Sequence, residues 1–192
     1  LLGNLSNKRV YEYSDAGCSN SYSQSTSVYN VPNVSFTGLD PNYCEDASEI
    51  IITGNQAPNG EFSGPGVFDQ NDGTAYFYPV IAGVGGPYQV IYSYENFNGC
   101  SATEEQETHV VENPVVIFTG LESSYCINNT SVILIGNFAP DGEFFGPGII
   151  DNSDGTASFD PAVAGVGGDY EIIYEYTSPE GCYGEAIQNV EV

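Results

Sequence analysis

An internal repeat with a constant offset of 82 residues constrains the fold of this chain more than any other feature. The segment FTGLDPNYC begins at Phe36, and its counterpart FTGLESSYC begins at Phe118. Three further segments, GNQAPNGEFSGPG, DGTAYFYP and AGVGGPY, recur at the same offset as GNFAPDGEFFGPG, DGTASFDP and AGVGGDY. Self-similarity at a fixed period is typical of arrays built from one structural unit. We therefore expect residues 32–113 and 114–192 to form two copies of one domain.

Residues 1–31 resemble the end of a further copy. The segment VYEYSDAGC, which ends at Cys18, matches IYSYENFNGC, which ends at Cys100, if its turn is one residue shorter. We predict that residues 1–31 are the C-terminal tail of a preceding repeat, and that the chain is a section of a longer array.

The local pattern within each copy is that of short β-strands. SEIIITG, TAYFYP and YQVIYSY are β-branched and aromatic runs bounded by Gly, Pro, Asn and Asp, and no helical period is present. Alternation places Tyr88, Val90, Tyr92 and Tyr94 on one strand face, which we expect to be buried. The predicted fold class is all-β, with tandem immunoglobulin-like β-sandwich domains arranged end to end.

The five cysteines favour one disulfide in each copy. Cys44 and Cys100 have the same spacing as Cys126 and Cys182, so the simplest pairs are 44–100 and 126–182, with Cys18 unpaired within the chain. Such bonds place the protein outside a reducing cytoplasm. Buried free thiols and an intermolecular bond through Cys18 remain open, whereas the lack of a CxxC spacing disfavours a cysteine metal site.

The charge excludes two classes of partner. Two Lys or Arg residues against 26 Asp or Glu give a formal net charge of −24. Binding to nucleic acid or to an anionic membrane depends on basic side chains, so neither is an expected partner. The chain also has no apolar run long enough for direct membrane insertion.

The combined spacing of the cysteines, of GEFSGPG, of DGTA and of AGVGG resembles the Ig-like repeats of large surface and secreted proteins of the Bacteroidota. These proteins include gliding-motility adhesins of the SprB type and other cargo of the type 9 secretion system. The resemblance covers both copies and the leading tail. It implies secretion, attachment at the exterior of the outer membrane, and a role in adhesion, spacing or filament building. It brings no catalytic residues.

Candidate chemistry is limited to calcium. The only histidine is His109, which Glu191 replaces in the second copy, so we expect a solvent-facing strand residue and no enzyme activity. DQNDGT recurs as DNSDGT, which makes Asp69, Asp72, Asp151 and Asp154 possible Ca²⁺ ligands. The alternative is a hairpin turn in which Asp-Gly supplies the positive φ. A second candidate calcium site lies at the junction between copies, where Glu112 and Asn113 are expected to meet Asp40, Glu45 or Asp46.

Exposed aromatic side chains indicate a possible ligand surface. Alternation turns Tyr76 and Tyr78 outward, whereas the second copy has Ser158 and Asp160 at these positions. A pair of exposed tyrosines can stack on sugar rings or contact a neighbouring protein. Ordinary strand surface is the alternative.

Two functions follow from these observations. The first is a structural or adhesive segment of a large extracellular surface protein, a semi-rigid stalk for adhesion or gliding motility. The second is an accessory spacer or carbohydrate-binding module of a secreted polysaccharide-degrading enzyme. The expected partners are neighbouring repeats of the same chain, other copies in a filament, or surface glycans.

Overall fold

The computed structural model describes residues 5–192 and divides the chain into two compact units. Unit 1 contains Leu1–Leu39, Glu49–Ile81 and Pro87–Thr108. Unit 2 contains Asp40–Ser48, Ala82–Gly86 and His109–Val192. Unit 2 therefore includes three short segments of the first sequence copy, residues 40–48, 82–86 and 109–113, as well as the whole of the second.

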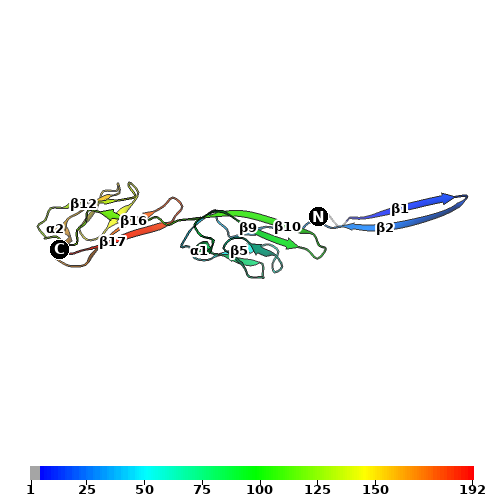
Figure 1. Ribbon diagram of the computed structural model, residues 1–192, viewed down its shortest axis with the longest axis horizontal. Helices are drawn as coiled ribbons and strands as arrows, with labels where there is room; N and C mark the ends of the chain where they lie inside the picture. The colour runs from blue at the N-terminus through cyan, green and yellow to red at the C-terminus, as the bar shows by residue number, and fades with distance from the viewer. Residues whose placement is uncertain (1–4) are drawn as a thin grey trace. The chain divides into compact units, whose positions relative to one another are not determined.

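The first copy forms a β-sandwich whose core lies in unit 1 (Figure 1). One sheet has the order β3-β5-β8-β7, and the other has the order β4-β10-β9-β6. Phe36, Ile52 and Ala75 from the first sheet pack against Phe62 and Tyr92 from the second. The strands are β3 (Phe36–Thr37), β4 (Asn42–Cys44), β5 (Ile50–Gly54), β6 (Glu61–Ser63), β7 (Val67–Asp69), β8 (Thr74–Phe77), β9 (Gly85–Glu95) and β10 (Ser101–Val111).

The second copy repeats this arrangement within unit 2. A sheet of order β11-β12-β15-β14 and a sheet of order β13-β16-β17 share a core that includes Phe118, Leu134, Phe144, Phe159 and Tyr174. The all-β sandwich prediction is confirmed, as is the buried face. The strands are β11 (Phe118–Thr119), β12 (Val132–Gly136), β13 (Glu143–Phe145), β14 (Ile149–Asp151), β15 (Thr156–Phe159), β16 (Tyr170–Thr177) and β17 (Tyr183–Val190).

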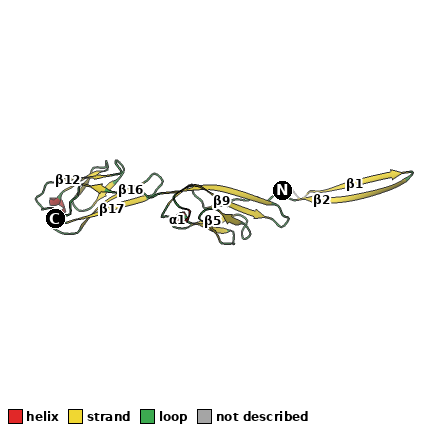
Figure 2. Cartoon of the chain, viewed as in Figure 1, coloured by secondary structure: helices red, strands yellow, loops and turns green. Residues whose placement is uncertain are grey.

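Among residues 5–192, two single-turn helices interrupt this pattern, and each follows a core strand. The one nearer the C-terminus is drawn in red in Figure 2. The two helices are α1 (Pro79–Ala82) and α2 (Pro161–Ala164). Each begins at a buried proline, which has the backbone φ that a helix start requires. Asp160 caps α2 because its carboxylate accepts a hydrogen bond of 2.9 Å from the amide of Ala162. Between residues 5 and 192, no helix is long and apolar enough to cross a membrane.

A glycine-walled slot holds the central tyrosine of each core. Tyr92 is fully buried, and a Cβ added at Gly54 or at Gly60 would overlap its ring. The Tyr92 hydroxyl accepts a hydrogen bond of 3.1 Å from the amide of Gln56. Tyr174 has the same setting in the second copy, between Gly136 and Gly142, and accepts from the amide of Phe138 at 3.0 Å. The repeated GN…G segment is therefore the wall of a ring-binding slot.

The segment before the first copy is a two-stranded ribbon of β1 (Leu5–Asp15) and β2 (Cys18–Val28), drawn in blue in Figure 1. Asp15 lies opposite Cys18, and the turn residues Ala16 and Gly17 both have positive φ, as a two-residue hairpin requires. The described side chains of β2 are exposed. This hairpin corresponds in sequence to β9–β10 and β16–β17.

Candidate functional site

The structure contains a disulfide that joins the two sequence copies. Cys44 of the first copy is bonded to Cys182 of the second, with a Cα–Cα distance of 5.4 Å and a sequence separation of 138 residues. Both cysteines belong to unit 2. Cys18, Cys100 and Cys126 are free thiols. The predicted pairs 44–100 and 126–182 are therefore wrong.

The length of β10 explains why Cys44 and Cys100 do not pair. Cys100 immediately precedes this strand, whereas Cys44 lies opposite Val111 at its end. A strand rises about 3.3 Å per residue, so the 11 residues of β10 separate the two cysteines by roughly 35 Å. A disulfide requires a Cα separation near 5.5 Å. In the second copy, β17 separates Cys182 from the segment of Cys126 in the same way, because Ser124 pairs with Glu191 beyond the end of that strand.

The bond closes a long loop and lies beside a polar contact. In the chain-entropy model, a crosslink between residues 138 apart stabilises the folded state by at most about 5 kcal/mol.

Next to Cys44, the amide of Glu45 donates to the carbonyl of Val111 at 2.9 Å. The Glu45 carboxylate accepts from the amide of Asn113 at 3.1 Å. The second candidate calcium site is thus brought together in part, as a Glu45–Asn113 hydrogen bond within unit 2.

The acidic turns act as hairpin turns. Asp72 accepts hydrogen bonds from the amide and the hydroxyl of Thr74, at 2.9 Å and 2.6 Å. Asp154 accepts the same pair from Thr156, at 3.0 Å and 2.6 Å. The hydroxyl of Thr74, followed by its amide, lowers the pKa of Asp72, because both stabilise the charged carboxylate. Asn71 and Gly73 have φ values of 58° and 85°, which is the conformation that the Asn-Asp-Gly sequence favours.

The calcium donors in each turn are few. Asp69 has a buried Oδ1 without a hydrogen-bond partner, whereas Asp151 accepts from the amides of Phe144 and Ser153. Ca²⁺ takes 6–8 oxygen ligands, and each turn offers two carboxylates. In the first turn Asp72 already accepts two hydrogen bonds, and in the second turn Asp151 and Asp154 each accept at least two. In the described part of the chain, no three His, Cys, Asp or Glu side chains are grouped as metal ligands. Calcium at Asp69, Asp72, Asp151 and Asp154 stays a prediction.

Tyr76 and Tyr78 lie on the outer face of β8 and its extension, beside further apolar side chains. Both are half-buried, and their ring centroids are 6.0 Å apart. Tyr78 also contacts Phe68 edge-on at 5.4 Å, and Phe68 and Ile51 pair with Tyr76 from the neighbouring strands. Phe68 and Ile51 are 47% and 59% exposed. We call Ile51, Phe68, Tyr76 and Tyr78 the aromatic face. Sequence alternation found its two tyrosines and missed Phe68, which is also part of an alternating strand.

His109 is exposed, as predicted, and its counterpart Glu191 is exposed as well. The backbone amide of His109 donates to the carbonyl of Pro41 at 2.9 Å, and the residue lies opposite Asn42 in the β4–β10 pairing. His109 thus has a place in the strand ladder.

Comparisons with known proteins found several solved structures that are similar to this chain. No family model matches the chain, and no curated protein matches it. One similar solved structure is described as a Ca²⁺-stabilized adhesin that helps an Antarctic bacterium reach out and bind ice. The two chains share 10% sequence identity, with a TM-score of 0.47. The match covers 97% of this chain, which spans 56% of the length of the other.

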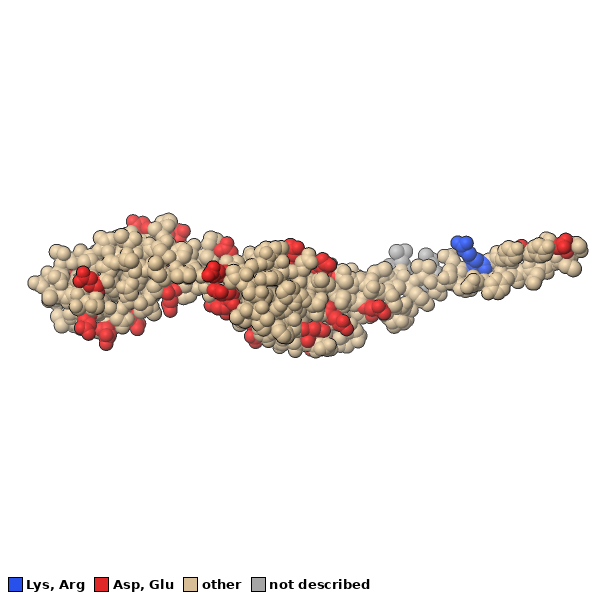
Figure 3. Space-filling model, in the orientation of Figure 1, with Lys and Arg blue, Asp and Glu red and all other residues tan. Residues whose placement is uncertain are grey.

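The acidic residues do not gather at one point. Figure 3 shows them spread over the visible surface, with the basic side chains together on the hairpin, where Lys8 and Arg9 lie on β1. One acidic group is organised by hydrogen bonding: the Tyr183 hydroxyl donates to Glu185 at 2.8 Å and to Glu175 at 3.1 Å. These bonds raise the pKa of Tyr183, with that to Glu185 contributing most.

Proposed function

We propose that the chain is a structural, adhesive repeat segment of a large extracellular surface protein. The observation that carries the proposal is the Cys44–Cys182 bond, which crosslinks one sequence copy to the next. Disulfides persist in oxidising compartments and are rare in the cytosol, so the bond supports an extracellular location. A covalent crosslink between successive copies resists extension of the chain under load, which suits a stalk. Adhesion and gliding motility are the roles that the Bacteroidota resemblance suggests for such a stalk.

Antibody labelling of intact source cells tests this function. Antibodies raised against the 192-residue chain are expected to label cells that have not been permeabilised, and external protease is expected to remove the label. Adding the same antibodies, or the soluble chain, is expected to reduce attachment of the cells to a surface. Labelling that requires permeabilisation would contradict the extracellular location. Surface labelling without any effect on attachment would leave a spacer and remove the adhesive role.

The aromatic face favours a second candidate function, the binding of carbohydrate. The ring of Tyr78 contacts those of Phe68 and Tyr76 on the outer surface of one sheet, which is an arrangement on which sugar rings can stack. The second copy supplies a matched control, because Ser158 and Asp160 occupy the places of the tyrosines in the same fold. This function would suit an accessory module of a polysaccharide-degrading enzyme as well as an adhesin.

The double variant Tyr76→Ser/Tyr78→Asp tests carbohydrate binding. It gives the first copy the outer residues of the second, so we expect it to fold. Retardation of the wild-type chain in gels containing soluble polysaccharides, such as xylan, laminarin or alginate, is expected to be lost in the variant. Equal mobility of the two proteins in every gel would remove this candidate and leave the stalk.

A further inference from the structure

The five cysteines occupy two kinds of position, which we call lead and hairpin positions. The lead cysteines, Cys44 and Cys126, follow a tyrosine and open a turn. The carbonyl of Cys44 accepts from the amide of Ala47 at 3.1 Å, and that of Cys126 accepts from Asn129 at 2.9 Å. Ala47 and Asn129 are equivalent residues of the two copies. The two lead cysteines therefore have the same local backbone.

The hairpin cysteines are Cys18, Cys100 and Cys182, each preceded by a glycine. The carbonyl of Cys100 accepts from the amide of Asn96 at 2.9 Å, and that of Cys182 accepts from Ser178 at 2.8 Å. Asn96 and Ser178 are again equivalent. Cys18 ends the turn of the β1–β2 hairpin. The observed bond joins the lead cysteine of one copy to the hairpin cysteine of the next.

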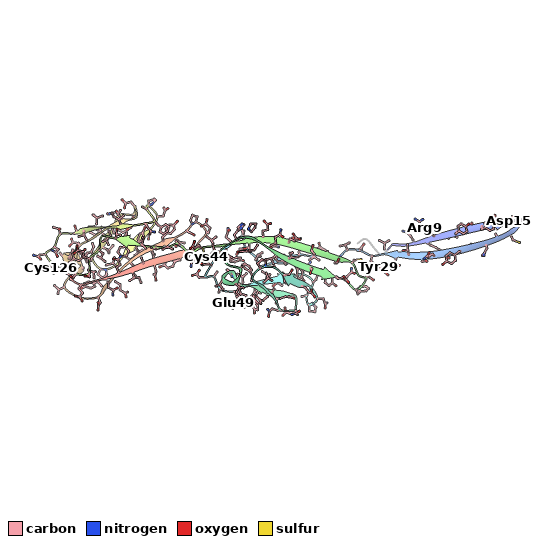
Figure 4. The ribbon with its side chains drawn as sticks, in the orientation of Figure 1. Arg9, Asp15, Tyr29, Cys44, Glu49 and Cys126 are labelled. Atoms are coloured by element: carbon pink, nitrogen blue, oxygen red, sulfur yellow. A yellow bond between two sulfur atoms is a disulfide. The ribbon has the colours of Figure 1, made fainter. Side chains whose placement is uncertain are left out.

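The surroundings of Cys126 match those of the bonded lead cysteine. In the first copy, β4 runs parallel to the end of β10, so that Asn42 lies opposite His109 and Cys44 opposite Val111. In the second copy, Ser124 lies opposite Glu191, and the amide of Tyr125 donates to the carbonyl of Glu191 at 2.9 Å. The Asn42–His109 pair and the Ser124–Glu191 pair occupy equivalent positions in the two copies. Cys126 is exposed, and Figure 4 shows it at the opposite end of unit 2 from Cys44.

The surroundings of Cys100 match those of the bonded hairpin cysteine. Its thiol donates to the carbonyl of Tyr29 at 3.9 Å. Tyr29 is equivalent to Val111, the residue that lies opposite Cys44 where Cys44 is bonded to Cys182. The Cys100 thiol therefore lies beside the backbone position at which the lead cysteine of a preceding copy would stand.

From this equivalence we infer that Cys126 bonds to the hairpin cysteine of a following copy and Cys100 to the lead cysteine of a preceding copy. The disulfides then form a staggered series in which every copy is crosslinked to both of its neighbours. The partner is a further copy of the same 82-residue repeat, so the inference rests on the proposed function as a repeat segment.

The oxidation proceeds by thiol–disulfide exchange with a small-molecule disulfide. The Cys126 thiolate attacks the oxidant, forms a mixed disulfide and releases one thiol. The hairpin thiolate of the following copy then attacks the Cys126 sulfur, forms the protein disulfide and releases the second thiol. Two protein thiols are oxidised, and the two sulfurs of the oxidant are reduced and leave with the two protons.

A lengthened chain tests the inference at Cys126. Residues 111–192 are repeated after Val192, because Val192 is equivalent to Val110, and the added copy carries Tyr183→Phe so that its hairpin-cysteine peptide differs in mass from that of Cys182. The protein is refolded in a mixture of oxidised and reduced glutathione. It is then alkylated, cut with a glutamate-specific protease and chymotrypsin, and mapped without reduction. We expect the peptide of Cys126 to be linked to that of the added hairpin cysteine, while Cys44 remains linked to Cys182. An added hairpin cysteine that is alkylated, or is linked to the lead cysteine of its own copy, would overturn the inference.

Two variants complete the test. Cys126→Ser in the lengthened chain is expected to leave the added hairpin cysteine as a free thiol without changing the Cys44–Cys182 bond, which serves as the internal measure of folding. A second chain, in which residues 32–113 carrying Ser101→Thr replace residues 1–31, has two Cys100 peptides of different mass. It is expected to link the original Cys100 to the lead cysteine of the added copy. If Cys100 is alkylated there while Cys44–Cys182 forms, the inference fails. Antibody labelling of intact cells tests the proposed function and does not depend on these disulfide maps. Failure of the disulfide inference can therefore be distinguished from failure of the proposed function.

Discussion

Thr108 provides a direct test of how the two copies differ in their cores. Thr108 is fully buried on β10, and its hydroxyl has no hydrogen-bond partner. The equivalent residue of the second copy is Val190, which is 1% exposed and belongs to the core. The substitution Thr108→Val therefore replaces an unpaired buried hydroxyl by a methyl group in a setting that the protein already uses.

The expected change in the free energy of unfolding follows from removing the buried, unpaired hydroxyl of Thr108. An unpaired buried polar group costs about 1–3 kcal/mol, and a buried methyl contributes about 0.8 kcal/mol. With some loss to imperfect packing, we expect Thr108→Val to raise the free energy of unfolding of unit 1 by about 1–2 kcal/mol. For a domain of this size, that corresponds to a rise in Tm of roughly 5–10 °C.

The assay must resolve the two units. Hydrogen exchange with mass spectrometry, followed through urea denaturation, reports unit 1 through peptides of β9 and unit 2 through peptides of β16. Thr108→Val is expected to shift the midpoint of β9 upward, and the reciprocal Val190→Thr is expected to shift that of β16 downward. A neutral or destabilising Thr108→Val together with a neutral Val190→Thr would refute the reasoning.

Three further predictions concern the slot, the acidic turns and the Tyr183 cluster. Gly54→Ala and Gly136→Ala are each expected to lower the stability of their own copy by about 3 kcal/mol or more, because the methyl overlaps a buried tyrosine ring; equal Tm values would contradict the slot. If the turns bind calcium, the Tm is higher in Ca²⁺ than in EDTA, and Asp72→Asn/Asp154→Asn abolishes the difference; an unchanged Tm of the wild type removes the metal. Because the folded pKa of Tyr183 lies above its ordinary value of 10.0, its contribution to stability is present below pH 10 and is lost as the pH rises further. The stability advantage of the wild type over Tyr183→Phe should therefore shrink above pH 10 in urea titrations, and a constant difference would contradict the cluster.

The sequence was sufficient for the strands and the cores because their signals are local. Alternation in YQVIYSY identifies the buried side of β9, and the fixed offset transfers that result to β16. The same offset could not decide the disulfide, because a shift of one whole repeat preserves every spacing. Pairing within a copy and pairing with the next copy are equally regular in sequence. Only the length of β10, which separates Cys100 from the end where Cys44 lies, distinguishes them.

The candidate sites depended on contacts that a linear pattern does not show. Alternation identified Tyr76 and Tyr78 but not Phe68, since its contact with Tyr78 comes from pairing between β7 and β8. The sequence left two interpretations of the Asp-Gly turns, a calcium site and a hairpin turn. In the structure, the hydroxyl of Thr74 donates a hydrogen bond to Asp72, which lies only two residues before it. That contact was within reach of sequence reasoning, because Asp and Thr at this spacing commonly close a turn.

Disulfide mapping of the unmodified chain tests the central claim most directly. After oxidative refolding, alkylation and digestion without reduction, we expect the peptides of Cys44 and Cys182 to be linked, with Cys18, Cys100 and Cys126 alkylated. The intact mass should fall by two hydrogen atoms relative to the reduced protein. Recovery of Cys44 linked to Cys100 and of Cys126 linked to Cys182, with the loss of four hydrogen atoms, would contradict the crosslink between successive copies.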